Sequence, residues 1–202
     1  MFLRANFLKK HILALAPAAL LFFGAAGMHS SGASAESRVN AREFNSGVSM
    51  FKRGEYELAS DMFKQLLEKY PDAKQIDEVK YWYAETRDRL KDYPGALDLY
   101  KKVITDHPAS KFFARSLFGA GYAAYRLNQF QESADYFVQA SKKGDEEITS
   151  ESLIMAAYCF NQLKQPAGAE AVLRELLANP KLSDKYGLDA RYELGRILIS
   201  SA

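Results

Sequence analysis

The sequence has 202 residues, of which 48% are hydrophobic and 26% are charged, and this composition is ordinary for one folded domain. Lysine and arginine number 27 and aspartate and glutamate 25, so the formal net charge is +2. A chain this close to neutral gives no reason to expect nucleic acid as a partner, because nucleic-acid recognition relies on an excess of basic side chains.

Residues 1–35 have the pattern of an export signal. A basic start precedes an apolar stretch from Ile12 to Phe23, and Ala33-Ser34-Ala35 offers a cleavage site of the small-x-small type. We therefore expect cleavage after about Ala35 and a periplasmic product. The alternative is an uncleaved membrane anchor. It is disfavoured because Gly24 and Gly27 interrupt the apolar run before it reaches the roughly 20 residues that a span needs.

Residues 44–71 have the pattern of two short helices joined by a tight turn, after a short polar lead-in at residues 36–43. Apolar residues recur at helical spacing on both sides of Gly54, which supplies the permissive backbone that a reversal needs. Tyr70-Pro71 ends the second helix, because a residue before proline is disfavoured in the helical conformation.

The same pattern returns along the chain at steps of roughly 36 to 38 residues. The turn that begins at Gly54 aligns with turns at Lys91, Asn128 and Lys164. Each first helix has a small residue in register, and each second helix has a small residue followed four positions later by a large apolar one. The first-helix residues are Gly47, Ala84, Gly121, Ala157 and Gly195, and the second-helix pairs are Ala59–Phe63, Ala96–Tyr100, Ser133–Phe137 and Ala169–Leu173.

This repeat resembles the tetratricopeptide repeat (TPR), and the resemblance covers residue 40 to residue 202. It implies an all-α fold, a TPR-type solenoid of antiparallel helix hairpins in a right-handed superhelix with about four full repeats and one extra helix. We expect repeats at about residues 40–76, 77–113, 114–149 and 150–187, with a partial copy at 188–202. The partial copy fits a capping helix, a docking face for another chain or an array that continues, and Gly195 favours the last two.

The helical pattern sets approximate limits for each expected helix. The expected helices cover residues 44–53, 56–70, 77–90, 94–107, 110–127, 131–142, 150–163, 166–178 and 186–199.

Catalytic signatures are missing after the signal. The chain has no Gly-rich phosphate loop, HExxH, CxxC or GxSxG. His107 stands beside a proline in a predicted turn, and Cys159, the only cysteine, has no basic neighbour that would activate it. Asp145-Glu146-Glu147 has the pattern of a solvated acidic loop, since the ligand spacing of an EF-hand is absent. We therefore expect a protein that is not an enzyme and has no cofactor and no metal.

In the TPR family the first helix of each pair lines the concave face, so the resemblance places a partner-binding groove on these helices. Tyrosine and arginine, the types enriched at interface hot spots, dominate its middle. Packing in the core is the favoured alternative for Phe118, and it is as well supported as partner contact for Tyr122, Tyr125 and Arg126. The predicted groove residues are Tyr81, Glu85, Arg89, Arg115, Phe118, Tyr122, Tyr125, Arg126, Tyr158 and Gln162.

The sequence favours a periplasmic, non-catalytic scaffold for protein–protein interaction in cell-envelope assembly or division. Residues 44–71 and 93–110 resemble exported TPR proteins that assist outer-membrane assembly or coordinate the Tol-Pal system. The expected partner is a protein or peptide in the groove, without nucleic acid and without stable membrane insertion after cleavage; self-association through the C-terminal helix is a further option. Two alternatives stay open, an accessory subunit of a polysaccharide-export or cell-wall enzyme complex, and the N-terminal fragment of a longer repeat protein with a missing C-terminal domain.

Overall fold

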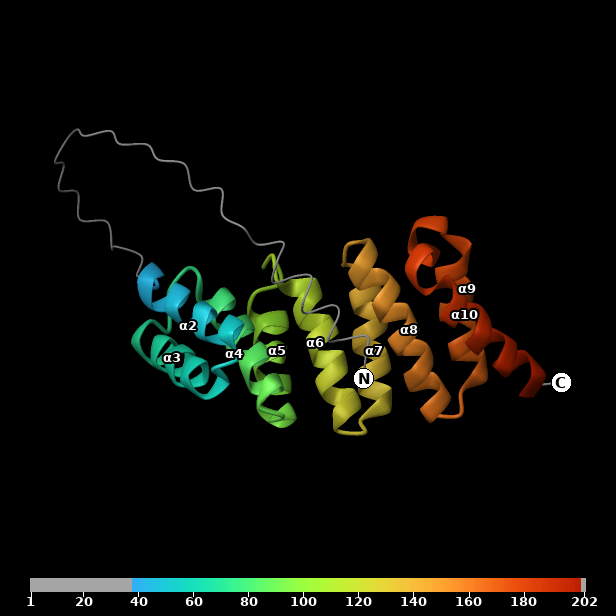
Figure 1. Cartoon of the computed structure of the whole chain (residues 1–202), viewed down its shortest axis with the longest axis horizontal. Coiled ribbons are helices and arrows are strands. Elements are labelled where there is room, and N and C mark those ends of the chain that lie inside the picture. The colour runs from blue at the N-terminus through green and yellow to red at the C-terminus, as the bar shows by residue number, and fades with distance from the viewer. Residues whose placement is uncertain (1–37, 201–202) are drawn as a thin grey trace, which may run out of the picture. The chain divides into compact units, whose positions relative to one another are not determined.

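The structure, a computed structural model, describes residues 38–200, so the predicted export signal at residues 1–35 lies outside the described residues. The described part of the chain forms nine α-helices and no strand (Figure 1). The helices are α2 (Ala41–Arg53), α3 (Tyr56–Lys69), α4 (Ile76–Arg89), α5 (Tyr93–Asp106), α6 (Phe113–Arg126), α7 (Phe130–Ser141), α8 (Glu146–Gln162), α9 (Pro166–Ala178) and α10 (Pro180–Ser200).

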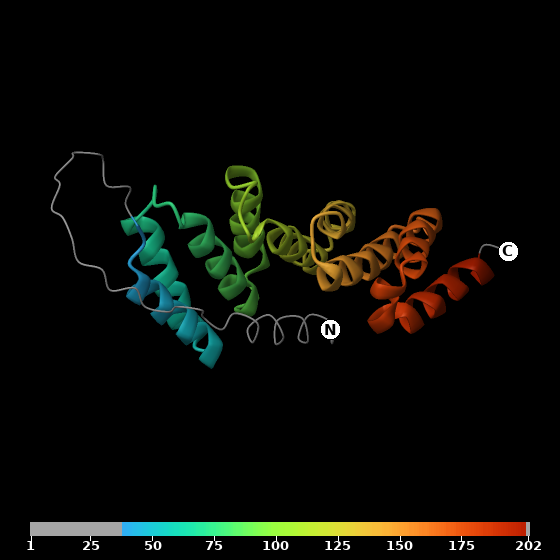
Figure 2. The same cartoon turned by 90° about the horizontal axis from the view of Figure 1, so that it is seen from above.

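The helices of the unit that begins at residue 38 follow one another in chain order from α2 to α10 (Figures 1 and 2). Each helix packs against its neighbours in sequence, which makes four hairpins: α2 with α3, α4 with α5, α6 with α7 and α8 with α9. The first helices of successive hairpins also contact one another, and α8 contacts α10 in the same way. The predicted all-α solenoid of antiparallel hairpins is confirmed.

Two helices, α8 and α10, begin four and six residues earlier than the sequence pattern predicts. Helix α8 starts at Glu146 instead of residue 150, because the Asp145 carboxylate accepts a hydrogen bond from the backbone N–H of Ile148 at 2.9 Å and caps the helix. The acidic run predicted as a loop is therefore a cap and a first turn, where negative charge is favoured by the helix dipole. Helix α10 starts at Pro180, a first-turn position that tolerates proline, and it runs through the predicted repeat limit at residues 187–188.

The four hairpin turns share one backbone conformation. Gly54, Lys91, Asn128 and Lys164 all have positive φ, of 84°, 64°, 59° and 57°. In each turn the next residue donates its N–H to the carbonyl five residues earlier, as Glu55 does to Met50 at 3.0 Å, and this is the hydrogen bond of a Schellman motif. The alignment of these turns in the sequence therefore corresponds to one geometry, although only the first copy has glycine.

Glycine at two of these turns should stabilise the protein. A non-glycine residue pays roughly 1–2 kcal/mol for the left-handed conformation, and glycine adds about 0.5–1 kcal/mol of unfolded-state entropy. We expect Lys91→Gly and Lys164→Gly each to raise the free energy of unfolding in urea by about 0.5–1 kcal/mol. Asn128→Gly should gain less, since asparagine tolerates this conformation.

Lys64→Gly is the matched control, because Lys64 is exposed inside α3. Glycine in a helix interior should cost about 1 kcal/mol there. A loss of stability in Lys91→Gly would contradict the prediction.

The small residue of each first helix lets the second helix come close. Phe63 and Phe137 are fully buried, and a Cβ added to Gly47 or Gly121 would lie 2.9 Å and 3.0 Å from their rings. Such contacts are closer than a packed core accepts without movement. Gly195 differs, since within residues 38–200 no atom lies within 4 Å of the position that its Cβ would take, apart from its two chain neighbours and the backbone of its own helix turn.

Overpacking at the hairpin crossing should be costly. Gly121→Leu forces a side chain against Phe137, so we expect it to lower the free energy of unfolding by about 1–3 kcal/mol. The measurement is thermal or urea unfolding followed by circular dichroism at 222 nm. The exposed substitution Lys64→Leu should change stability by only about 0.5 kcal/mol, and an equal effect of both substitutions would show that the crossing is not tightly packed.

Candidate partner-binding face

Three of the predicted groove residues belong to the core. Tyr81, Glu85 and Phe118 are 5%, 3% and 3% exposed. Tyr81 stacks on Phe112 with ring centroids 4.4 Å apart, and the Glu85 carboxylate accepts a hydrogen bond from the hydroxyl of Tyr100. Phe118 packs edge-on against a buried ring of α7. These side chains hold hairpins together and are not part of the accessible surface.

Three further predicted residues lie at the edges of the hairpins. Arg89 is half-buried, with its guanidinium carbon 5.7 Å from the ring centroid of Phe51 and 5.9 Å from that of Tyr56, so it ties α4 to the first hairpin. Arg115 is half-buried, and its Nε has no hydrogen-bond partner within residues 38–200. Gln162 is exposed at the end of α8.

An exposed guanidinium sits between two phenol rings at the end of α6. The guanidinium carbon of Arg126 lies 4.5 Å from the ring centroid of Tyr93 and 6.0 Å from that of Tyr122, and its NH1 donates to the Tyr122 hydroxyl at 3.4 Å. The hydrogen bond to Tyr122 raises the pKa of Arg126 above its ordinary value. We call Tyr93, Tyr122 and Arg126 the Arg126 cluster. The planar guanidinium contacts both rings and donates in a fork that suits directional recognition of an oxygen-bearing group.

Tyr93 was absent from the predicted groove, because it begins a second helix and the groove was placed on first helices. Its signal in the sequence is the aromatic residue two positions after the turn, present as Tyr56, Tyr93 and Phe130. In the first and third hairpins this aromatic packs on the first helix of its own hairpin, as Phe130 does on Tyr125. Tyr93 contacts Arg126 of the following hairpin.

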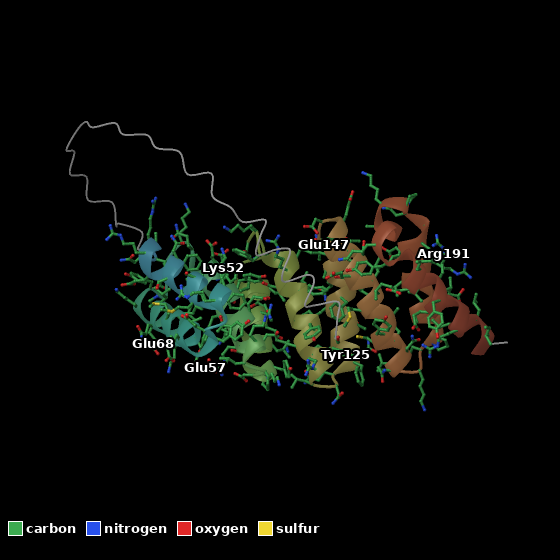
Figure 3. All side chains as sticks on the ribbon, viewed as in Figure 1. Lys52, Glu57, Glu68, Tyr125, Glu147 and Arg191 are labelled. Carbon is green, nitrogen blue, oxygen red and sulfur yellow. The ribbon has the colours of Figure 1, made fainter. Side chains whose placement is uncertain are left out.

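Two half-buried phenols continue the polar-aromatic surface from α6 to α8. Tyr125 packs edge-on against Phe130 with centroids 5.6 Å apart, and it lies near the α6–α7 turn (Figure 3). Tyr158 of α8 is near the α10 carboxylates Glu193 and Asp189. Burial raises the pKa of both phenols, and for Tyr158 these carboxylates raise it further, so both are neutral hydrogen-bond donors at physiological pH.

A second buried carboxylate is structural. Glu151 of α8 is 1% exposed and accepts hydrogen bonds from the Tyr186 hydroxyl and, at 3.2 Å, from Lys185 Nζ, both of α10. Burial raises the pKa of Glu151 despite these partners. The arrangement repeats that of Glu85 and Tyr100, with a first-helix carboxylate held by a tyrosine of a neighbouring helix.

Cys159 is a buried, inert thiol. It has no exposed surface, its Sγ lies 3.1 Å from Ser133 Oγ, and that hydroxyl also donates to the Gly121 carbonyl at 2.7 Å. Burial raises the pKa of Cys159 to about 11. The thiolate that a nucleophile requires is therefore scarce at neutral pH.

The raised pKa of Cys159 predicts a loss of stability at alkaline pH. The unfolded thiol loses its proton near pH 9 and the folded one near pH 11, so the folded state binds more protons between them. We expect the free energy of unfolding to fall over this interval by about 2–3 kcal/mol through this group.

Urea unfolding at pH 8, 9, 10 and 11 would measure the loss, with Cys159→Ala as the comparison. Tyr186, whose pKa is also raised, contributes equally in both chains, so the difference in slope isolates Cys159. Parallel pH profiles of the two chains would rule out the predicted linkage.

Two kinds of site are missing from the described residues. Between residues 38 and 200, no three histidine, cysteine, aspartate or glutamate side chains are grouped so that they could hold a metal ion. Over the same part of the chain, no helix is both long enough and apolar enough to cross a bilayer.

Four stacked hairpins with a further helix define a helical-hairpin repeat protein. Two family models, both described as tetratricopeptide repeat, match residues 43–73 and 78–110, and residues 118–184. The chain belongs to the tetratricopeptide-repeat family, as its sequence pattern predicted. Proteins of this family generally act as non-catalytic scaffolds that bind peptide or protein partners.

Solved structures have the same fold. YrrB, described as a TPR protein with an unusual peptide-binding site, is 15% identical with a TM-score of 0.64, covering 80% of this chain and 77% of that one. A putative kinesin light chain with TPR-like repeats from Podosopora anserina is 14% identical with a TM-score of 0.61, covering 79% and 85%. MamA from Desulfovibrio magneticus RS-1 is 18% identical with a TM-score of 0.57, covering 66% and 71%. No curated protein sequence matches the chain.

Proposed function

We propose that this protein is a non-catalytic scaffold that binds a segment of a partner protein across the Arg126 cluster and the neighbouring phenols Tyr125 and Tyr158. The observation that carries the proposal is the exposed Arg126 guanidinium held between two tyrosine rings. Arginine and tyrosine both bury a large area on binding, and both are enriched among residues that dominate binding energy.

The chemistry of this surface favours a segment with a carboxylate or a backbone carbonyl at the position of Arg126. A guanidinium donates in a planar fork that matches such oxygens. The hydroxyls of Tyr122, Tyr125 and Tyr158 can bond to the polar backbone of the same segment, while their rings pack on its side chains. The peptide-binding site described for YrrB supports a peptide-like ligand for this fold.

The scaffold is proposed to work in the periplasm, in assembly or division of the cell envelope. The support is the signal pattern of residues 1–35 and the resemblance of residues 44–71 and 93–110 to exported repeat proteins. Mass spectrometry of the protein from an osmotic-shock fraction tests the location. A mature chain that begins at Glu36 supports it, whereas an intact chain retained in the cytosol would refute it.

Partner capture should depend on Arg126. A photoreactive residue at exposed Gln129, three residues after Arg126 and outside the Arg126 cluster, is expected to cross-link a partner in living cells, and the same residue at exposed Gln65 of α3 is not. We expect Arg126→Gln to lower the cross-linking yield about tenfold, which corresponds to a loss of about 1.4 kcal/mol of binding free energy. Arg174→Gln, at an exposed arginine of α9, is the matched control and should leave the yield unchanged.

Mass spectrometry of the cross-linked product then identifies the partner. Proteins of outer-membrane assembly or division support the proposed context. A polysaccharide synthase or cell-wall hydrolase supports the role of accessory subunit instead. Equal cross-linking yields from Gln129 and Gln65, with unchanged helicity, would show that the Arg126 cluster is not the binding face.

A further inference from the structure

The outer side of α10 carries an apolar stripe. Leu188, Tyr192 and Ile199 are 80%, 68% and 81% exposed, and Gly195 lies between the last two with open space above it. Spacings of four, three and four residues place these positions on one side of the helix. A contiguous apolar stripe of this kind marks an interaction surface.

The opposite side of α10 is already used for packing. Tyr186, Ala190 and Ile197 are buried, and α10 contacts α8 and α9. Rotating α10 to bury the exposed stripe against α8 and α9 would therefore expose these three buried side chains.

Other hairpins show what covers the equivalent stripe. In the first and third hairpins, the residues in register with Tyr192, Gly195 and Ile199 face the second helix of their own hairpin. These residues are Phe44, Gly47 and Phe51 in α2, and Phe118, Gly121 and Tyr125 in α6.

The contacts in these hairpins define the shape of the covering helix. Phe44 meets Phe63 at a centroid distance of 6.2 Å, and Phe51 meets Tyr56 at 5.4 Å, so the two helices run antiparallel. The covering helix has a large residue, a small one three positions later and a large one four positions after that, as in Tyr56-Ala59-Phe63. Helix α7 has the same order.

The stripe of α10 has this order itself, since Tyr192-Gly195-Ile199 is large, small and large at the same spacings. We propose that α10 of one copy packs antiparallel against α10 of a second copy, about a two-fold axis beside Gly195. Tyr192 then meets the partner's Ile199, and Ile199 meets the partner's Tyr192. This is the self-complementary contact of an isologous dimer. The absence of a Cβ at Gly195 allows the two backbones to come close.

The charges beside the stripe permit this pairing. Arg196 is paired with Glu193 at 3.0 Å, and exposed Arg191 projects from α10 four residues before Gly195 (Figure 3). In the antiparallel pair, the two copies of Arg191 are about 14 Å apart along the axis, beyond the screening length of about 8 Å at physiological salt. One helix pair buries little area, so the dimer should depend on protein concentration.

Disulfide trapping tests the geometry in the full chain, because Cys159 is buried and does not interfere. Under oxidising conditions Gly195→Cys should form a covalent dimer, since its two copies meet at the axis. Leu188→Cys, the matched exposed control, should not, because its copies lie about 22 Å apart along the axis and a disulfide needs Cα atoms within about 7 Å. Equal trapping of both variants, or none, would overturn the proposal.

Sedimentation equilibrium tests the stripe without a new cysteine. The full chain should shift from monomer to dimer as concentration rises, and Ile199→Glu should stay monomeric at every concentration with unchanged circular dichroism. Leu58→Glu is the control, because Leu58 is a large apolar residue of α3 that is 55% exposed. A monomeric parent chain, or a dimer that survives Ile199→Glu, would refute the pairing.

Discussion

The close approach of two antiparallel helices at a small residue is the constraint on which the rest of the structure depends. Where Gly47 and Gly121 lie, an aromatic ring of the second helix occupies the space of the missing side chain. That contact fixes the distance between the two helices of the hairpin and the position of one helix along the axis of the other. The shared turn conformation then sets the direction in which the second helix runs back along the first. Successive first helices contact one another and form one layer. The positions of the surface phenols follow from this register.

Much of the fold could be predicted from the sequence, because the repeated spacing of small residues and turns is itself the packing rule. The starts of α8 and α10 were misplaced because they depend on side-chain caps at Asp145 and Asn179, which hydrophobic spacing does not record. The groove was harder to predict. A first helix lies between its own second helix and other first helices, so large residues occur on several sides, and spacing alone does not separate buried Tyr81 from accessible Tyr122.

Two surfaces of the molecule have opposite chemistry. The Arg126 cluster presents a cation and phenol hydroxyls, so as the proposed binding face it would select a partner by the direction of hydrogen bonds. The α10 stripe presents aliphatic and aromatic carbon, so in the proposed dimer it would select by shape. Because α6 and α10 are separate helices with α7, α8 and α9 between them in the chain, the proposed partner segment and the proposed second copy would bind to different helices and could be bound at the same time. Linked binding faces gain apparent affinity without any new contact.

The placement of the single thiol has a consequence if the chain is exported as proposed. An unpaired cysteine in an oxidising compartment forms mixed disulfides with small thiols and with other proteins when its sulfur can be reached. Cys159 is fully buried beside Ser133, and the packing that encloses it is the crossing that Gly121 makes possible. A folded chain is therefore protected from such adducts, while a chain that has not closed this hairpin exposes the sulfur. Disulfide adducts on Cys159 would therefore identify chains that have not folded completely.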